Sequence, residues 1–541
     1  MLSSLRHGLS PLNILRRRRL HTRRGDLLNR WPGWEVVIGI EVHAQIRSRA
    51  KLFSDTLTSE LGQPANTHVS AFDAAFPGTL PRLNHKCVDL AVRTAVALNS
   101  NVQRSSSFDR KHYFYFDLPA GYQITQHYAP VSLGGYLKID GDIPIRIKQI
   151  QLEQDTAKLI VEPRTRTPYI DFNRAGSALM EIVSEPDLTS PEEASNYVIR
   201  LQRLLRAIGS CDGSMEKGSL RCDVNVSVNR PGSPPGTRCE IKNLNSIKFM
   251  YAAIKCEIQR HISILNSSPH ASVPQETRGF NEDTFETFKL RSKEDAPDYR
   301  YMPDMNLGVL RLTEDYIQGI RQTMPELPDA AWVRLQQRYS LSDAQIAVLL
   351  AFDSEKEIPY DGEAFRDGPV AYFERVAALT ENPRVACNWV TNELVGQLTA
   401  RRETYNDNTV TAEQLAELIN LVRDKILTRS SGQQLLRYML DNPSQTASPT
   451  ELAHKLDLIA MSHSSGSASA TMVTPAKPAA DLHALCVAAI EGLPSEAEAF
   501  RRGNKNVLNK IVGHVMRASR GRADALAAKQ ALEELLNDHQ T

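Results

Sequence analysis

The 541-residue sequence lacks several patterns that would place it in a familiar class. It has no apolar run of about eighteen residues, so no membrane span is expected. It has neither the phosphate-binding loop GxxxxGK[ST] nor the protein-kinase signature, so a nucleotide site would have to be of another type. Its seven cysteines are odd in number and form no CxxC pair, which indicates reduced thiols in the mitochondrial matrix or the cytosol and no zinc-finger framework.

Acidic residues are absent from the first 25 positions, which contain seven arginines, at positions 6, 16–19, 23 and 24. An Arg-rich, Ser-containing, acid-free N-terminus is typical of a mitochondrial transit peptide. The alternative is a basic nucleic-acid arm, but interspersed Leu and Ile residues favour targeting because a solvated arm would not need them. We therefore expect residues 1–30 to be a transit peptide, cleaved before Trp31, and the mature protein to lie in the mitochondrial matrix.

The segment 36–46 (VVIGIEVHAQI) alternates apolar and polar side chains as a β-strand does. Ile40 and Val42 point into a core, whereas Glu41 and His43 share the opposite face. A carboxylate and an imidazole on one strand face can share a metal ion or a proton. The alternative is an edge strand with one hydrated face.

Later segments repeat this alternation and predict adjacent antiparallel strands. Residues 219–229 and 238–242 place amides and charges of both signs on one face, among them Arg221 and Asp223. A merely solvated face would be irregular and rich in Lys and Glu, so this pattern favours a ligand-binding sheet. The polar residues that share a face in two further segments, 143–156 and 179–185, are Gln149, Gln151, Glu153 and Asp155, and Glu181 and Glu185.

Aromatic and basic residues are interleaved in 108–119 (FDRKHYFYFDLP), which includes Lys111. This pattern is typical of a base-stacking or nucleotide pocket, and equally of ordinary strand packing. Residues 275–304 are dense in polar groups and form an exposed hairpin on one interpretation. On the other, Arg291 and Arg300 hold phosphate groups, because guanidinium pairs bidentately with phosphate.

Helical spacing takes over from about residue 316, after an earlier helix that is expected between Ser190 and Gly209. Residues 462–480 are low in complexity, so a disordered insert is expected there. The last helical unit, 481–537, carries basic residues without an intervening acid, which face either solvent or a phosphate backbone. These basic residues are Arg501, Arg502, Lys505, Lys510, Arg517, Arg520 and Arg522.

From the residues alone, we expect an α+β domain with a polar cleft, followed by helices and a basic helical tail. Clustered carboxylates with one His and several Arg and Lys side chains suit Mg²⁺-dependent phosphoryl transfer.

Long motifs run through the first domain and continue in the tail. They are VIGIEVHAQ (37–45), AFPGTLPRLN (75–84), FDRKHYFYFDLPAGYQITQ (108–126), LEQDTAK (152–158), DFNRAGSALMEIVSEPD (171–187), MEKGSLRCDVNVSVN (215–229), EIKNLNS (240–246), QETRGF (275–280), DYRYMPD (298–304) and GNKNVLNKIVGHVMRAS (503–519). Together they closely resemble the B-subunit family of the glutamyl-tRNA(Gln)/aspartyl-tRNA(Asn) amidotransferases, in a mitochondrial form. The tail and the insert match least well.

The resemblance implies an α+β fold in which an antiparallel-sheet cradle domain, similar to glutamine synthetase, is followed by an all-α helical domain and a small helical tail. On this basis the cradle is expected at 31–315, the helical domain at 316–412, and the tRNA-binding tail, with its insert, at 413–541.

The resemblance also implies an activity. With ATP and Mg²⁺, the cradle would phosphorylate the side-chain carboxylate of Glu misacylated on tRNA(Gln), and ammonia delivered through a channel would convert it to Gln-tRNA(Gln). This chain has no Ser-Ser-Lys amidase signature or glutaminase cysteine motif, so the nitrogen source must lie on a partner. The expected partners are the amidase (A) subunit, the small (C) subunit or its fungal-type equivalent, and Glu-tRNA(Gln), which the helical part would bind by shape and backbone contacts.

Site residues are carried over motif by motif. Glu41 and His43 match the motif of the metal site, with Glu181 as a further ligand. Lys111 matches the lysine of the site, which could neutralise developing phosphate charge, and Asp223 lies in the same cleft as a second catalytic candidate. The nucleotide-binding candidates remain Arg221, Arg291 and Arg300.

One motif departs from the family pattern. Bacterial members carry two consecutive acids where this chain has Glu153 and Gln154. Strand alternation places these two side chains on opposite faces and does not decide which acid is the ligand. We take Glu153 as the fourth metal ligand.

Two other functions fit parts of this pattern. A free-standing ATP-dependent carboxylate–amine ligase would act without tRNA or a partner, and the helical tail argues against it. A non-catalytic tRNA-binding scaffold would tolerate replacement of Glu41, His43 and Glu181.

Overall fold

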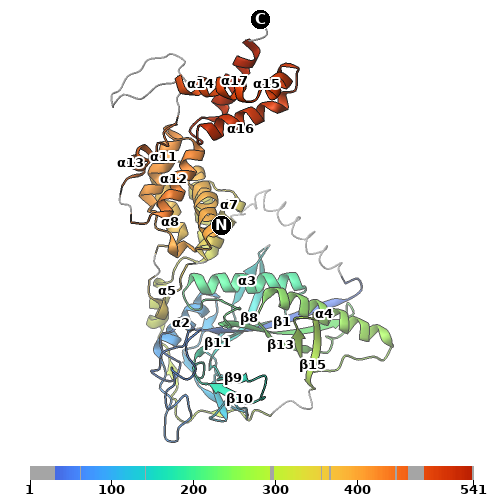
Figure 1. Cartoon of the computed structure of the whole chain (residues 1–541). Helices are drawn as coiled ribbons and strands as arrows, with labels where there is room; N and C mark the ends of the chain where they lie inside the picture. The colour runs from blue at the N-terminus through green and yellow to red at the C-terminus, as the bar shows by residue number, and fades with distance from the viewer. Residues whose placement is uncertain are drawn as a thin grey trace, which may run out of the picture. The chain divides into compact units, whose positions relative to one another are not determined.

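The computed structural model describes residues 31–60, 62–140, 142–292, 298–354, 356–364, 367–444, 447–460 and 480–538 (Figure 1). The expected transit peptide at 1–30 lies outside the described residues, as does the expected insert except for Ala480, the first residue of a helix. The chain divides into two units, one formed by residues up to 330 with 358–365, the other by 331–357 with 366–541. Among the described residues, no helix has the length and apolar character needed to cross a membrane.

A ten-stranded sheet lies at the centre of the first unit. In sheet order its strands are β15 (Glu286–Ser292), β14 (Glu276–Asn281), β13 (Cys239–Leu244), β12 (Leu220–Asn229), β1 (Glu35–Gln45), β11 (Ala178–Ser184), β8 (Ile143–Gln154), β6 (Ser132–Leu133) and β2 (Asn101–Val102), with β7 (Tyr136–Ile139) also paired to β8. Within this sheet β13 and β14 are parallel, and the other pairs are antiparallel. The expected antiparallel pairing of 219–229 with 238–242 is confirmed.

Shorter strands form three small sheets in the same unit. They are β3 (Ser105–Ser106) with β17 (Leu310–Arg311), β9 (Lys158–Val161) with β10 (Pro168–Asp171), and β4 (Asp109–His112) between β5 (Tyr122–Thr125) and β16 (Met302–Pro303).

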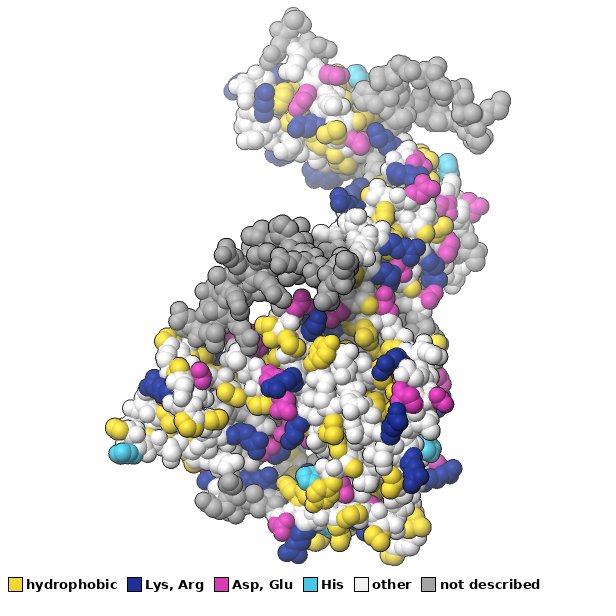
Figure 2. All heavy atoms as spheres, turned by 180° about the vertical axis from the view of Figure 1, so that it is seen from behind, with side chains coloured by type: hydrophobic (Ala, Val, Ile, Leu, Met, Phe, Trp, Pro, Cys, Tyr) yellow, Lys and Arg dark blue, Asp and Glu magenta, His cyan; other side chains and the backbone are white. Residues whose placement is uncertain are grey.

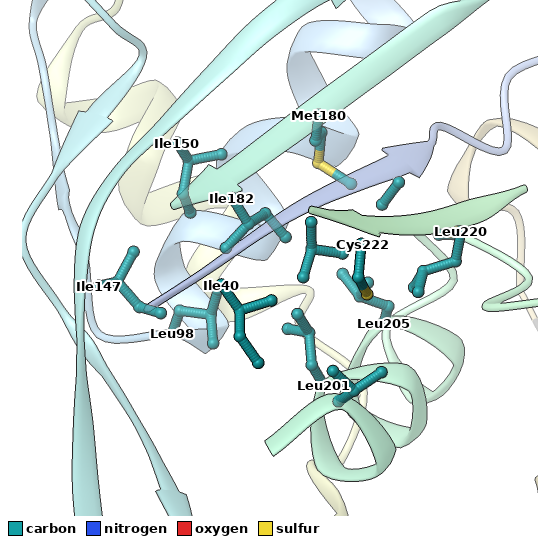
Figure 3. Packing of buried hydrophobic residues seen from close by; sticks show 14 of the residues in the cluster. Ile40, Leu98, Ile147, Ile150, Met180, Ile182, Leu201, Leu205, Leu220 and Cys222 are labelled. Carbon is teal, nitrogen blue, oxygen red and sulfur yellow. The ribbon is translucent and has the colours of Figure 1, made fainter. Parts of the chain in front are cut away.

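One face of the large sheet is apolar and is covered by α2 (His85–Ala97), α3 (Pro191–Ala207) and α4 (Ile247–Ser267). Figure 1 shows α3 and α4 along this face. Figure 3 shows Ile40 of β1 and Cys222 of β12 beside Leu201 and Leu205 of α3, and all four side chains are fully buried. The expected alternation in 36–46 is therefore confirmed, because burial of one face leaves Glu41 and its neighbours on the other.

Helix α3 begins and ends as its sequence predicts. The Ser190 hydroxyl accepts a hydrogen bond from the Glu193 amide (3.1 Å), and Pro191 occupies the first turn. The helix ends before Gly209, whose φ of +72° is readily adopted by a residue without a side chain.

A buried ionic network joins α4 to the hairpin of β14 and β15. Both carboxylate oxygens of Glu257 accept hydrogen bonds from Nε of Arg260 (3.1 Å each), and Arg278 Nε lies 3.3 Å from Glu257 Oε2. His261 contacts Glu257 at 3.0 Å. The Cys239 sulfur, Glu257 and His261 lie close enough to share a cation, but the two guanidinium groups already balance the carboxylate, so the network ties two elements together.

This network predicts a pH-dependent contribution to stability. Burial alone would raise the pKa of Glu257, but the bonds with His261 and Arg260 lower it from 4.5 to about 2. A lowered carboxylate pKa gives stability that is complete above about pH 4.5 and is lost as the pH falls towards 2. Glu257→Gln should therefore lower the stability of this region by about 2 kcal/mol at pH 7, measured as faster hydrogen exchange in α4. The difference in stability between Glu257→Gln and wild type should become smaller below pH 4.5. If this difference did not change with pH, the lowered pKa of Glu257 would be contradicted.

Helices make up the second unit, as expected from the change of pattern. The helices of the chain from residue 314 onward are α5 (Glu314–Gln322), α6 (Pro328–Tyr339), α7 (Asp343–Asp353), η1 (Tyr360–Gly362), α8 (Pro369–Thr380), α9 (Pro383–Asn388), η2 (Trp389–Leu394), α10 (Val395–Arg401), η3 (Tyr405–Asp407), α11 (Ala412–Arg423), α12 (Arg429–Asp441), α13 (Pro449–Lys455), α14 (Ala480–Gly492), α15 (Pro494–Arg501), η4 (Lys505–Val507), α16 (Leu508–Ala518) and α17 (Ala525–Asp538). Of these, α5 packs Ile317 into the core of the first unit. The short η1 also belongs to the first unit. The second unit has two cores, one of residues 335–458 and one of residues 482–536.

Charges of both signs are mixed on the protein surface. Figure 2 shows one face, on which Lys and Arg side chains lie among Asp and Glu side chains. This mixture agrees with the near-neutral net charge of +1.

Candidate active site

The polar face of the large sheet gathers residues from four strands around β1. His43 of β1 lies opposite Glu181 of β11 on one side and Arg221 of β12 on the other. Glu41 pairs in the same way with Asp223. Strand β8 adds Glu153, because β8 lies beside β11. Strand register, and not distance along the chain, therefore brings these side chains together.

The centre of the site is a cluster of His43, Glu153 and Glu181. Nδ1 of His43 lies 2.9 Å from Oε1 of Glu153. One ligand atom from each of the three residues lies within 4.8 Å of the others. The Glu153 side chain is 5% exposed and that of His43 is 22% exposed, so Glu153 is shielded from water while His43 remains open to a ligand.

Burial and mutual repulsion shape the charges of this cluster. Burial lowers the pKa of His43, but the hydrogen bond with Glu153 and the nearby carboxylates outweigh it and raise this pKa to about 9. Burial and the Glu153 charge raise the pKa of Glu181 to about 7. Burial would also raise the pKa of Glu153, yet His43 holds it below its usual value. Negative charge is thus crowded where a proton or a cation would relieve it.

Two ion pairs flank the cluster. Nζ of Lys242 donates to Oδ2 of Asp223 (2.8 Å) and lies 2.9 Å from Glu240, while the amide of Asn243 donates to Oδ1 of Asp223 (2.8 Å). Burial lowers the pKa of Lys242, but the two carboxylates outweigh it and raise this pKa above its usual value. Oδ2 of this Asp223 also lies 4.0 Å from Nε2 of His43.

On the opposite side, Arg221 donates to Asp155 (2.9 Å). Asp155 therefore holds the guanidinium of Arg221 beside the cluster. Lys111 of β4 also acts on this region, because its charge reaches both Glu153 and Glu181. Arg221 lies opposite His43 in the strand register, and the positive charge of Lys111 acts on Glu153 and Glu181.

The other predicted residues lie at different distances from the cluster. Glu41 lies on the same strand face but accepts a hydrogen bond from Asn225 (3.0 Å). Arg291 lies on the edge strand β15, which β14, β13 and β12 separate from β1, and it contacts Thr277 of the neighbouring β14 (3.4 Å). The structure does not bring Arg300 to the cluster: its side chain is 82% exposed and its guanidinium lies 3.7 Å from Asp298.

Three polar residues at the site were not among the predicted site residues. Gln151 donates to Glu181, Asn225 donates to Glu41, and Lys242 holds Asp223. Their polar strand positions were visible in the sequence, but nothing there showed which carboxylate each one would meet.

Comparison with known proteins identifies the family of this chain. Residues 36–318 match the model of the GatB/GatE catalytic domain, and residues 371–536 match the model of the GatB domain. The chain belongs to the GatB family.

Relatives of this GatB chain span nearly its whole length. It is 58% identical to the B subunit of the mitochondrial glutamyl-tRNA(Gln) amidotransferase of Laccaria bicolor, over 94% of this chain and 93% of the relative. It is 42% identical to the protein of the same name from Cryptococcus neoformans, over 99% and 100%. It is 39% identical to the B subunit of the aspartyl/glutamyl-tRNA(Asn/Gln) amidotransferase of Rickettsia rickettsii, over 93% and 98%.

Glu153 and Gln154, the adjacent residues where two acids were expected, have different surroundings in this GatB chain. Glu153 meets His43, as described above. Gln154 instead lines a cavity of about 270 Å³ together with Asp117, Asp155 and Thr156. The geometry thus supports Glu153 as the member of the pair that serves the cluster.

Proposed function

We propose that this chain is the B subunit of a mitochondrial glutamyl-tRNA(Gln) amidotransferase and takes part in forming Gln-tRNA(Gln). The names of the fungal relatives support the substrate and the compartment. Such an enzyme is a carbon–nitrogen ligase with glutamine as the nitrogen donor. The observation that carries a catalytic role for this chain is the cluster of His43, Glu153 and Glu181, in which Glu153 is buried and the other two are partly exposed.

The donor set of this cluster fits a divalent cation. Carboxylate oxygens are the ligands that Mg²⁺ prefers. Burial and then the Glu153 charge raise the pKa of Glu181, and a cation would favour its charged form. We propose that His43, Glu153 and Glu181 hold Mg²⁺, with Glu41 next to them on β1. A bound Mg²⁺ would offset the charge of the transferring phosphoryl group of ATP.

The chain's own cations complete the proposed site. A carboxylate is a poor acyl donor until one oxygen becomes a leaving group, and ATP-dependent phosphorylation supplies that group. Lys111 and Arg221 place positive charge beside the cluster, where they can hold phosphate oxygens. Asp223, fixed by Lys242 and the Asn243 amide, orients groups on the other side. Arg291 and Arg300 remain candidates for the outer phosphates, Arg300 only if it turns inward from its exposed position.

The remaining parts of the assembly are proposed from the family. The first domain would be a cradle similar to glutamine synthetase, the helical domain would occupy 316–412, and the tail at 413–541 would bind tRNA. The amidase (A) subunit would release ammonia, the small (C) subunit or its fungal-type equivalent would complete the complex, and a closed path would keep ammonia away from water.

The test uses the chain co-expressed with its amidase partner. With Glu-tRNA(Gln), ATP, Mg²⁺ and glutamine, wild type should form Gln-tRNA(Gln) and hydrolyse ATP faster when Glu-tRNA(Gln) is added. Glu181→Gln should lose both activities, with tRNA binding by gel shift unchanged. Full activity of Glu181→Gln would leave the chain as a scaffold, and amide formation without tRNA or partner would make it a free-standing ligase.

A further inference from the structure

A row of aromatic rings lies beside the carboxylate cluster and has no role in the proposed chemistry so far. His127 and Tyr301 are stacked, with ring centroids 3.8 Å apart and planes 8° apart. Tyr128 meets both rings edge-on, at 4.8 Å from His127 and 6.3 Å from Tyr301. Tyr299 continues the row, 6.1 Å from Tyr301. The rings come from two segments far apart in sequence.

The row adjoins the phosphate-binding side of the proposed site. Nζ of Lys111 lies 4.8 Å from the centroid of Tyr299. His127 and Tyr128 follow β5, whose Thr125 lies 3.4 Å from Gln151, and Gln151 in turn donates to Glu181 of the cluster. A ligand whose charged end occupies the cluster would therefore extend its other end along the rings.

These rings differ from the aromatic pairs that fill the core. Phe53 and Phe108 meet edge-on at 5.5 Å, and their side chains are 1% and 2% exposed. In the row, by contrast, Tyr128 is 65% exposed and His127 is also exposed. Parallel stacking of a polar ring at the surface is poorly explained by core packing. Partly exposed polar rings are what nucleobase stacking uses, because they offer a flat face without needing full burial.

We propose that His127, Tyr128, Tyr299 and Tyr301 form a stacking platform for an adenine base. This inference rests on the proposed function, which supplies two adenosines: that of ATP and the terminal adenosine that carries the glutamyl group on tRNA. Each has its reactive group a short, flexible distance from the base, so that the base reaches the rings when the reacting carboxylate or phosphate reaches the cluster. Burial lowers the pKa of His127, so its imidazole is neutral at pH 7.5 and stacks without a charge.

The experiment compares Tyr301→Leu and His127→Leu with Tyr301→Phe, in the full complex with the amidase partner. Tyr136→Leu serves as the matched control, because this tyrosine on β7 is partly exposed and contributes no ring to the row. We measure binding of ATP with Mg²⁺, binding of inorganic tripolyphosphate with Mg²⁺, and the KM for Glu-tRNA(Gln).

If the base of ATP stacks on the row, both Leu variants should bind ATP about 10- to 100-fold more weakly, while tripolyphosphate binding is unchanged. If the terminal adenosine of tRNA stacks there, ATP binding should stay constant and the KM for Glu-tRNA(Gln) should rise by a similar factor. In either case Tyr301→Phe should stay within about threefold of wild type, because the ring is kept.

Two outcomes would overturn the platform. One is that both Leu variants match wild type in all three measurements. The other is an equal loss of ATP and tripolyphosphate binding, which would show that the rings support the phosphate side only. Failure of the proposed function would give a different result: wild type itself would form no Gln-tRNA(Gln), independently of any substitution in the aromatic row.

Discussion

Glu153→Gln is expected to lower the rate of Gln-tRNA(Gln) formation by on the order of 10²-fold or more. The Glu153 carboxylate lies 2.9 Å from His43 and crowds Glu181. An amide keeps the shape but removes the charge that holds His43 and that would attract a cation. The measurement is single-turnover formation of Gln-tRNA(Gln) with saturating ATP, Mg²⁺ and glutamine.

Two neighbouring variants make this result specific. Gln154→Ala should lose less than about tenfold, because Gln154 lines the adjacent cavity and not the cluster. Glu185 comes directly after β11, beyond the register shift at Val183 and Ser184. Glu185→Gln should therefore form Gln-tRNA(Gln) at a rate close to that of wild type. If Gln154→Ala were the more damaging change, the second position of the pair would be the functional one, and the assignment of Glu153 would fall.

Asp73→Ala is expected to destabilise the first unit by about 3–5 kcal/mol. The Lys51 side chain is fully buried, and its Nζ donates to Asp73 Oδ2 (3.1 Å) and to the carbonyls of His68 (2.7 Å) and Phe172 (3.3 Å). Burial lowers the pKa of Lys51, whereas Asp73 opposes that effect. Removing Asp73 leaves a buried ammonium without a counter-charge.

The matched control is the pair of Asp55 and Arg82, which lies 3.0 Å apart but has side chains 81% and 79% exposed. Asp55→Ala should cost about 0–1 kcal/mol, because water and side-chain entropy offset an exposed pair. Urea unfolding of the three proteins, followed by fluorescence, measures both effects. Equal losses in the two variants would show that burial does not govern the contribution of Lys51 and Asp73.

Local periodicity in the sequence was sufficient to predict strand β1 and helix α3. The alternation in 36–46 predicted that Ile40 would be buried and that Glu41 and His43 would share the opposite face, because side-chain period is a property of the strand itself. The cap at Ser190 and the stop at Gly209 predicted α3 for the same reason, since both act within one helical turn. Long motifs predicted the family, which the comparisons confirm.

Part of the site followed from the motifs as well. Lys111, Arg221 and Asp223 were singled out from interleaved or alternating polar patterns. Arg221 lies opposite His43 in the strand register, and Oδ2 of Asp223 lies 4.0 Å from Nε2 of His43, while the charge of Lys111 acts on Glu153. The pattern for Arg300 was no weaker, yet this side chain lies exposed beside Asp298. Charged residues in the motifs thus indicated where the site lies. They did not show which side chains point into it.

Short-range patterns and motifs in the sequence established which residues alternate, where helix α3 begins and ends, and to which family the chain belongs. The pairing of β11 with β1, and of β8 with β11, became visible in the tertiary structure, and its register brings Glu181 and Glu153 to His43. It also decided that Gln154 faces a separate cavity. Strand pairing depends on hydrogen bonds between separate segments of the chain, and its register is set by burial of the whole apolar face and not by any one motif.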